Sequence, residues 1–198
     1  MNKAKSFDTQ KLVLLAMLTA IVFILQFIAI ATRTVFPVFA ISLVLIPIVI
    51  GAALIGVYAG LWLGLVFGTA VLLSGDAAAF LIVDPFATIL VVLVKGSLAG
   101  LAAGIVYRLL FKKNKTVAVT ISAIICPVIN TGIFLIGVYI FFLPTISEWG
   151  LANGFVNATE YIFISLIGVN FLFELGLNLV LSPVIVRLLQ YRQNQKLL

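Results

Sequence analysis

The chain has 198 residues, of which 64% are hydrophobic and only 9% are charged, and its net charge is +6. A water-soluble domain needs far more polar surface, so this composition excludes a soluble globular protein. The absence of histidine excludes imidazole metal sites and histidine-based acid–base catalysis, and a single cysteine excludes a disulfide framework. We therefore expect no catalytic residue, metal site or cofactor. We attribute the positive charge to membrane orientation rather than to nucleic acid binding.

Hydropathy predicts an all-α integral membrane protein that forms a single domain over residues 1–198. About 20 apolar residues cross a bilayer, and most segments between the charged clusters approach or exceed that length. We expect a bundle of six transmembrane helices with both termini in the cytoplasm, at approximately 11–31, 39–55, 57–73, 86–110, 117–143 and 159–187. Polar or helix-breaking stretches separate these helices, at 33–37, 51–56, 74–85, 111–115 and 144–160.

The first three expected helices are rich in small residues. The first helix follows basic residues, as in a signal peptide, but it is long and lacks a convincing cleavage site, so we interpret it as retained. Its Ala16 and Ala20 are four residues apart, a spacing that lets another helix approach closely. The same spacing gives the third helix a flat glycine face, made by Gly56, Gly60, Gly64 and Gly68. Residues 41–73 are almost wholly apolar, so one kinked helix is the alternative to the second and third helices.

The distribution of basic residues supports six spans. With the N-terminus inside, the cytoplasmic side carries ten of the twelve, namely Lys3, Lys5, Lys11, Arg108, Lys112, Lys113, Lys115, Arg187, Arg192 and Lys196. The outer side then holds Arg33 together with the acidic residues Asp76, Asp84, Glu148 and Glu160. This asymmetry follows the positive-inside rule, which a reversed or five-span topology would break.

Two charged side chains interrupt otherwise apolar helices. Lys95 lies in the fourth helix, about 14 Å below its outer end at a rise of 1.5 Å per residue, and Glu174 lies near the middle of the sixth. An isolated charge at the centre of a membrane helix costs about 2.5–3.5 kcal/mol on insertion scales. Such residues therefore face a bundle interior or a wet cavity.

Polar neighbours of these charges recur at helical spacing and form one stripe on each of the last three helices. The stripes are Asp84, Thr88 and Lys95, then Ser122, Cys126 and Asn130 with Thr131 beside them, then Asn170, Glu174 and Asn178. We expect an outward-opening ligand cavity built mostly by these helices. Its candidate substrate-binding residues are Lys95, Glu174, Asn130, Thr131, Asn170, Asn178, Arg33 and Thr88. The structural alternative is that Lys95 and Glu174 pair with each other while the amides join neighbouring helices.

These features together resemble the substrate-binding S components of energy-coupling factor (ECF) vitamin transporters over essentially the full length. The resemblance includes six helices, a basic cytoplasmic edge, the sequence AMLTA at 16–20 and the polar outer half of helices four to six. The stretch LLSGDAAAFLIVDPFATILVVLVKGSLAGLAAGIVYRLL also resembles the pantothenate-specific branch.

The resemblance implies a multi-pass subunit of the bacterial plasma membrane. Such a subunit binds a vitamin or precursor from outside and delivers it inward with a membrane scaffold subunit and two cytoplasmic ATPases. It implies that Ala16 and Ala20 contact the scaffold, that the glycine-rich helices keep this surface flat, and that the loop at 32–39 caps the pocket. The chain itself has no Walker A sequence with which to hydrolyse ATP.

Pantothenate is the substrate we expect, because Lys95 can hold its carboxylate while the amide side chains bind its amide and hydroxyls. Glu174 argues partly against this choice, because it would compete for Lys95, and hydroxymethylpyrimidine is the rival substrate. Cobalamin and folate are disfavoured because we expect few aromatic residues in the pocket beyond Tyr139, Phe142, Tyr161 and Phe171.

Two other classes of protein are compatible with the sequence. A stand-alone secondary transporter would use Lys95 and Glu174 as a proton relay and would need no ATPase partner. An intramembrane enzyme would need a nucleophile and a base, and no plausible pair is found.

Overall fold

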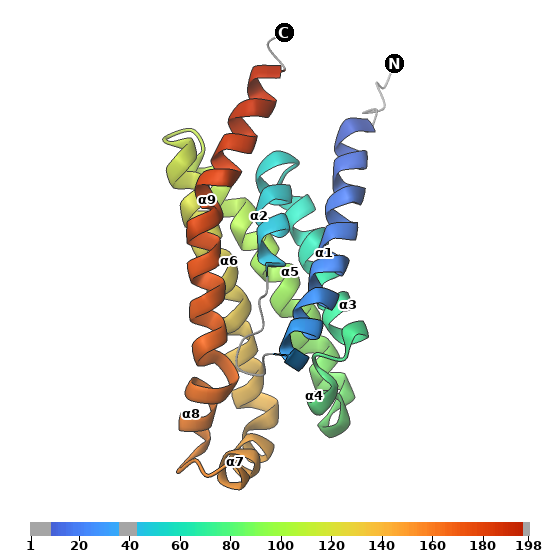
Figure 1. The fold of residues 1–198 in the computed structure, drawn as a ribbon, viewed down its shortest axis with the longest axis vertical. Helices are drawn as coiled ribbons and strands as arrows, with labels where there is room; N and C mark the ends of the chain where they lie inside the picture. The colour runs from blue at the N-terminus through green and yellow to red at the C-terminus, as the bar shows by residue number, and fades with distance from the viewer. Residues whose placement is uncertain (1–8, 36–42, 196–198) are drawn as a thin grey trace.

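The computed structural model describes residues 9–35 and 43–195, and every element in this part of the chain is a helix. In chain order they are α1 (Thr9–Val35), α2 (Leu45–Leu54), α3 (Val57–Ser74), α4 (Ala78–Val83), α5 (Pro85–Leu110), α6 (Lys115–Gly137), the π-helix η1 (Val138–Phe142), α7 (Leu143–Ala152), α8 (Ala158–Tyr161), the π-helix η2 (Ile162–Gly168) and α9 (Val169–Gln195). The all-α class predicted from hydropathy is confirmed, and Figure 1 shows the helices as an elongated bundle.

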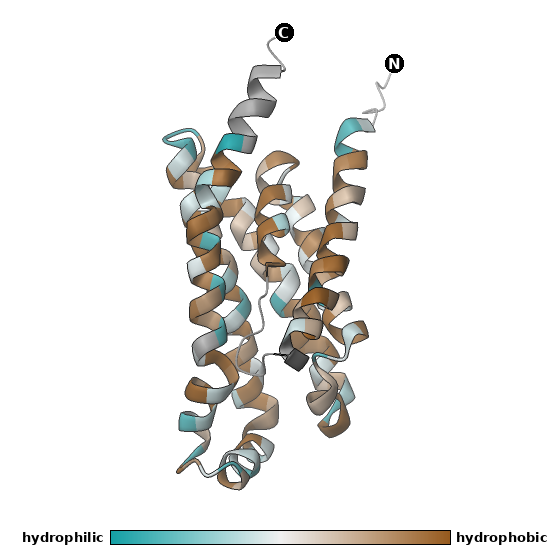
Figure 2. Cartoon of the chain, in the orientation of Figure 1, coloured by the Kyte–Doolittle hydropathy of each residue, from teal (hydrophilic) through white to brown (hydrophobic). Residues whose placement is uncertain are grey.

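Five stretches of helix are long and apolar enough to cross a membrane. They are Thr9–Thr32, Val57–Ser74, Pro85–Leu110, Lys115–Ala152 and Ala158–Arg187. The apolar colour of Figure 2 covers most of their length. The predicted second span, 39–55, coincides with the ten residues of α2, which extend about 15 Å and reach only halfway across a hydrocarbon core of about 30 Å. Residues 39–42 lie outside the described part of the chain, so the count of six spans stays a prediction.

The glycine-rich segment at 51–56 forms a hairpin turn between two helices. Gly56 has φ 140°, a conformation that favours glycine, and it separates α2 from α3. Gly51 of α2 lies against Leu63 of α3, although a continuous helix would hold residues twelve positions apart at about 18 Å. The alternative of one kinked helix over 41–73 is therefore wrong.

The glycine stripe of α3 packs against α5. A Cβ added at Gly64 would overlap the carbonyl oxygen of Gly96, and one added at Gly60 would overlap that of Gly100. The two helix backbones thus touch where neither carries a side chain, as in other close membrane packings. We predicted that the glycines would help to keep the surface around Ala16 and Ala20 flat. Gly60 and Gly64 pack within the bundle because Gly100 and Gly96 of α5 match them in register, and their effect on that surface stays a prediction.

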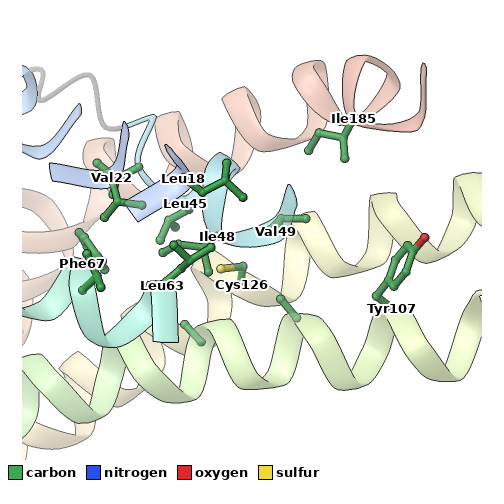
Figure 3. Packing of buried hydrophobic residues seen from close by; sticks show 14 of the residues in the cluster. Leu18, Val22, Leu45, Ile48, Val49, Leu63, Phe67, Tyr107, Cys126 and Ile185 are labelled. Carbon is green, nitrogen blue, oxygen red and sulfur yellow. The ribbon is translucent and has the colours of Figure 1, made fainter. Parts of the chain in front are cut away.

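A hydrophobic core joins α1, α2, α3, α5, α6 and α9. Figure 3 shows its centre, where Leu18 and Val22 of α1 approach Leu45 and Ile48 of α2 and Leu63 of α3. All five side chains are buried, and Leu18 is the most exposed of them at 5%. This packing fixes which face of α1 points inward.

Two stretches that we predicted as breaks contain helices. The 74–85 break includes α4, and the loop predicted at 144–160 includes α7 and α8. Pro144 does not prevent α7, because it occupies the first turn, where a helix has no backbone bond to lose. Ile146 of α7 is completely buried, so packing stabilises a helix in a segment of polar composition.

The beginning of α1 and the end of α9 lie at the same end of the bundle, and α4, α7 and α8 lie at the opposite end (Figure 1). Lys112, Lys113 and Lys115 follow α5 and are exposed. The same-end arrangement agrees with an even number of crossings. The side of the membrane on which each end lies stays a prediction.

Candidate functional site

A cavity of about 180 Å³ lies toward the end of the bundle that carries α4 and α7. It is bounded by α1, α3, α4, α5, α6, α9 and both π-helices. Its polar lining residues are Gln26, Asp76, Thr88, Lys95, Asn130, Thr131, Asn170 and Glu174. Its phenylalanines are Phe67, Phe80, Phe134, Phe142 and Phe171.

Six of the eight predicted substrate-binding residues line this one cavity. They are Thr88, Lys95, Asn130, Thr131, Asn170 and Glu174. They come together because α5, α6 and α9 each turn one polar stripe toward the same space. The six side chains thus line one cavity, and we propose a binding role for them below.

Of the other two predicted residues, one lies elsewhere and the side chain of the other is not described. Asn178 is completely buried and does not line the cavity, and its Nδ2 donates a hydrogen bond of 2.8 Å to the backbone oxygen of Glu174. Arg33, which we predicted in a loop, belongs to the last turn of α1. Its side chain is outside the described part of the structure.

Lys95 reaches an aromatic wall of the cavity. Its Nζ lies 5.0 Å from the centroid of the Phe134 ring on α6, within the range of a cation–π interaction. The negative face of the ring thus contributes to holding the ammonium in an apolar bundle. Glu174 on α9 is 6% exposed and lines the same space.

Two cavity amides contain buried oxygen atoms that lack a hydrogen-bond partner in the described structure. These are Oδ1 of Asn130 and Oδ1 of Asn170. A buried acceptor without a partner costs about 1–3 kcal/mol. Side chains in this state are able to bind a ligand without first breaking a bond within the protein.

Thr88 is fixed by the beginning of α5. Asp84 caps this helix by accepting a hydrogen bond of 2.9 Å from the Ala87 amide, and the Thr88 hydroxyl donates 2.7 Å to the Asp84 carbonyl. Asp84 therefore has a structural role, although we predicted it on the same stripe as Lys95. The oxygen of the Thr88 hydroxyl retains the ability to accept a hydrogen bond.

Helix α1 and the turn after α3 also contribute polar groups to the cavity, which we did not predict. Gln26 is 2% exposed, and its Nε2 donates to Ser74 Oγ and to Asp76 Oδ2, each at 3.3 Å. We predicted a cavity made mostly by the last three helices, but Gln26 and Asp76 also line it. Gln26 could have been recognised as an amide in the middle of a membrane span, where polar residues are costly.

The prediction of few aromatic walls was also wrong. Five phenylalanines line the cavity, and two of the four predicted aromatic residues, Tyr139 and Tyr161, do not. Tyr139 is 42% exposed, whereas Tyr161 packs edge-on against Phe155 at 5.3 Å. Helix-wheel positions alone do not show which aromatic residues point inward, because η1 rotates the end of α6.

Comparison with known families assigns the chain. A model of the family described as "ECF transporter, substrate-specific component" matches residues 10–186. The chain belongs to this family. No curated protein and no solved structure matches the chain.

Membership makes this ECF component a transport subunit rather than an enzyme, and it agrees with the apolar helices of a multi-pass membrane protein. The family implies a small-molecule substrate and a membrane complex with scaffold and ATPase subunits. The match covers every residue that lines the cavity, so the cavity belongs to the family domain.

Proposed function

We propose that the cavity is the substrate site of this ECF component. In this proposal the chain takes up a small water-soluble molecule from outside a bacterial cell. It then delivers the molecule inward with a membrane scaffold subunit and two cytoplasmic ATPases. The observation that carries the proposal is the presence of six predicted polar residues around one cavity in an apolar bundle.

The cost of these residues in a membrane supports a ligand role. Ionisable side chains within membrane spans are rare and usually functional, and Lys95 and Glu174 both line the cavity. The unpartnered oxygens of Asn130 and Asn170 add a further cost, which a bound molecule with hydrogen-bond donors would remove. A lock between helices would gain more from amides that bonded to each other.

The outer face of α1 supports a contact with the scaffold. Ala16 and Ala20 are exposed, while Leu18 and Val22 of the same helix are buried in the core. One helix therefore presents small residues outward and also supplies Gln26 to the cavity. This arrangement suits docking of a partner helix in the membrane.

Pantothenate and hydroxymethylpyrimidine are the two substrate candidates from the sequence. Lys95 in the cavity favours the first, because an ammonium can bind a carboxylate. Glu174 and Asp76 in the same cavity favour the second, because carboxylates accept hydrogen bonds from an amino group.

The proposal is tested by purifying the chain alone and together with co-expressed scaffold and ATPase subunits. Liposomes that contain each preparation are then assayed for uptake of labelled pantothenate and labelled hydroxymethylpyrimidine. We expect uptake only by the full complex and only with ATP. Uptake by the chain alone, driven by a proton gradient, would instead identify the stand-alone secondary transporter.

A variant of the cavity connects the site to this activity. Asn170→Leu removes one amide at similar volume, and we expect it to reduce uptake while the complex still assembles. Asn153→Leu is the matched control, because Asn153 is exposed at the end of α7. Equal uptake by both variants would remove the cavity from the transport path.

A further inference from the structure

We infer that the cavity selects a planar ring that is neutral or cationic and carries N–H or O–H donors, and that it rejects carboxylate anions. This inference rests on the proposed function, because it assigns a chemical class to the substrate of the same site. Three independent features of the lining support it, namely its charge, its aromatic walls and its unpartnered amides.

The charge of the described lining disfavours an anion. It contains one cation, Lys95, and two carboxylates, Asp76 and Glu174. An anionic substrate bound at Lys95 would share the cavity with both carboxylates. Because charges interact more strongly in a dehydrated cavity than in water, a like-charge contact there is heavily penalised. A ligand with donors or a positive charge meets an excess of acceptors.

The position of Lys95 agrees with a role in balancing the negative charge of the two cavity carboxylates, Asp76 and Glu174. Its Nζ lies over the Phe134 ring, at 5.0 Å from the centroid. Asp76, in contrast, accepts a hydrogen bond from the Gln26 amide, whose Nε2 is 3.3 Å from Asp76 Oδ2. This hydrogen bond orients the Asp76 carboxylate, a group that only accepts hydrogen bonds.

The aromatic residues make a site for a flat molecule. Phe80 packs edge-on against Phe134 at 5.8 Å and against Phe142 at 5.0 Å, which holds three rings together on the cavity wall. Phe67 and Phe171 also line the cavity. Aromatic faces carry partial negative charge, so they attract cations and the positive edges of other rings more than they attract anions.

The amides of Asn130 and Asn170 add recognition of hydrogen-bond donors. The Oδ1 atom of each is buried without a partner in the described structure. A ring that bears an amino or hydroxyl group can supply the missing donors, whereas a carboxylate supplies none. Donor recognition of this kind discriminates strongly, because the analogue without the donor leaves buried polar atoms unpaired.

The inference is tested with matched neutral and anionic probes on the detergent-purified full chain. The neutral probes are hydroxymethylpyrimidine, adenine and nicotinamide, and the anions are pantothenate and nicotinate. Nicotinamide and nicotinate form the sharpest pair, because they share one ring and differ in a neutral amide against a carboxylate. Binding is measured by calorimetry and by the shift of the melting temperature.

We expect at least one neutral probe to bind and each anion to bind more weakly or not at all. We expect Glu174→Gln and Asp76→Asn to weaken that binding by about tenfold, because an amide oxygen accepts a weaker hydrogen bond than a carboxylate does. Glu148→Gln is the matched control, because Glu148 is exposed on α7, and its affinity should equal that of the wild type. The melting temperature of each unliganded variant shows whether it is folded.

Tighter binding of pantothenate or nicotinate than of every neutral ring would overturn the inference, as would binding of no neutral probe. Affinities of folded Glu174→Gln and Asp76→Asn equal to that of the control would overturn it as well. Assembly with the scaffold and ATPases is measured on the same preparation. A complex that assembles, transports and prefers an anion refutes only the substrate class, whereas a chain that neither assembles nor transports refutes the proposed function.

Discussion

Single polar side chains in this protein connect helices that are distant in the sequence. Gln26 of α1 donates to Ser74, the last residue of α3, and to Asp76 just beyond it, across 48 and 50 residues. These bonds lie where the two helices border the cavity. The same amide therefore contributes both to the packing of α1 and to the orientation of a carboxylate in the site.

Replacement of Gln26 should destabilise the protein. We expect Gln26→Leu to lower the free energy of unfolding by about 1–3 kcal/mol, because it leaves Asp76 and Ser74 without this donor. The melting temperature in detergent measures the effect. Gln10→Leu is the control, since Gln10 is exposed near the beginning of α1. A Gln26→Leu variant as stable as Gln10→Leu would show that the contact carries no stability.

Phe80 has a comparable role among the aromatic residues. Its ring packs edge-on against Phe134, Phe142 and Trp149, the last at 5.5 Å, and thereby joins α4 to α6, η1 and α7. The short α4 thus takes part in the cavity wall through one large side chain. Aromatic pairs of this geometry contribute about 0.5–1.5 kcal/mol each beyond their buried area.

At the scale of elements, α3 and α5 form the tightest pair. Gly60 and Gly64 of α3 meet Gly100 and Gly96 of α5 with no room for a Cβ between the backbones. Lys95 directly precedes Gly96 in the chain. The glycine contact therefore also fixes the position of the Lys95 side chain along the axis of the bundle.

Replacement of glycine by alanine should destabilise the protein at the closely packed α3–α5 positions but not at an open position of α6. We expect Gly64→Ala and Gly96→Ala to cost about 1–3 kcal/mol, because the added carbon forces the helices apart. Beyond the adjacent backbone of α6, no atom of the described residues lies within 4 Å of a Cβ added at Gly132. Gly132→Ala should therefore be neutral or stabilise by up to about 1 kcal/mol through helix propensity. Melting temperatures of the three variants decide this, and equal values would contradict the close α3–α5 contact.

The exposed face of α1 is the element to which we assign docking. Ala16→Leu and Ala20→Leu should leave substrate binding and melting temperature near the wild-type values but should reduce recovery of scaffold and ATPase subunits in co-purification, because bulk prevents close helix approach. Ala152→Leu, at an exposed position at the end of α7, is the control for added bulk. Normal co-purification of both α1 variants would dismiss this surface.

At the scale of the whole molecule, the exposed lysines between α5 and α6 and the cavity lie toward opposite ends. The exposed lysines of residues 112–115 follow α5 at the end where α1 begins, and α4, α7 and α8 are found at the other end (Figure 1). The positive-inside rule predicts that the lysine end is cytoplasmic and that the cavity is nearer to the outside.

Cysteine labelling tests this orientation. Cys126 is the only cysteine and is completely buried, so a Cys126→Ala background allows single cysteines to be introduced at exposed positions. We expect a membrane-impermeant maleimide to label Glu148→Cys in intact cells and to label Lys113→Cys only after the membrane is opened. The reverse pattern would invert the topology, and labelling of both in intact cells would contradict the separation of the two ends.

The sequence by itself determined the all-α membrane class and the polar stripes of the last three helices. Both depend on properties that act locally, namely apolar length against bilayer thickness and the periodicity that puts residues four apart on one face of a helix. Residues such as Lys95, Asn130 and Glu174 could therefore be assigned to a shared cavity before the helices were placed in space.

Only the tertiary structure decided which other segments complete the cavity. Gln26, Asp76 and Phe80 belong to three different segments, and they meet because helix packing brings those segments together, which no local pattern records. The reversal between α2 and α3 and the helix at 143–152 likewise depend on contacts made by Gly51 and Ile146 with distant parts of the chain. Local periodicity assigns a residue to a face, but packing between helices determines what that face meets.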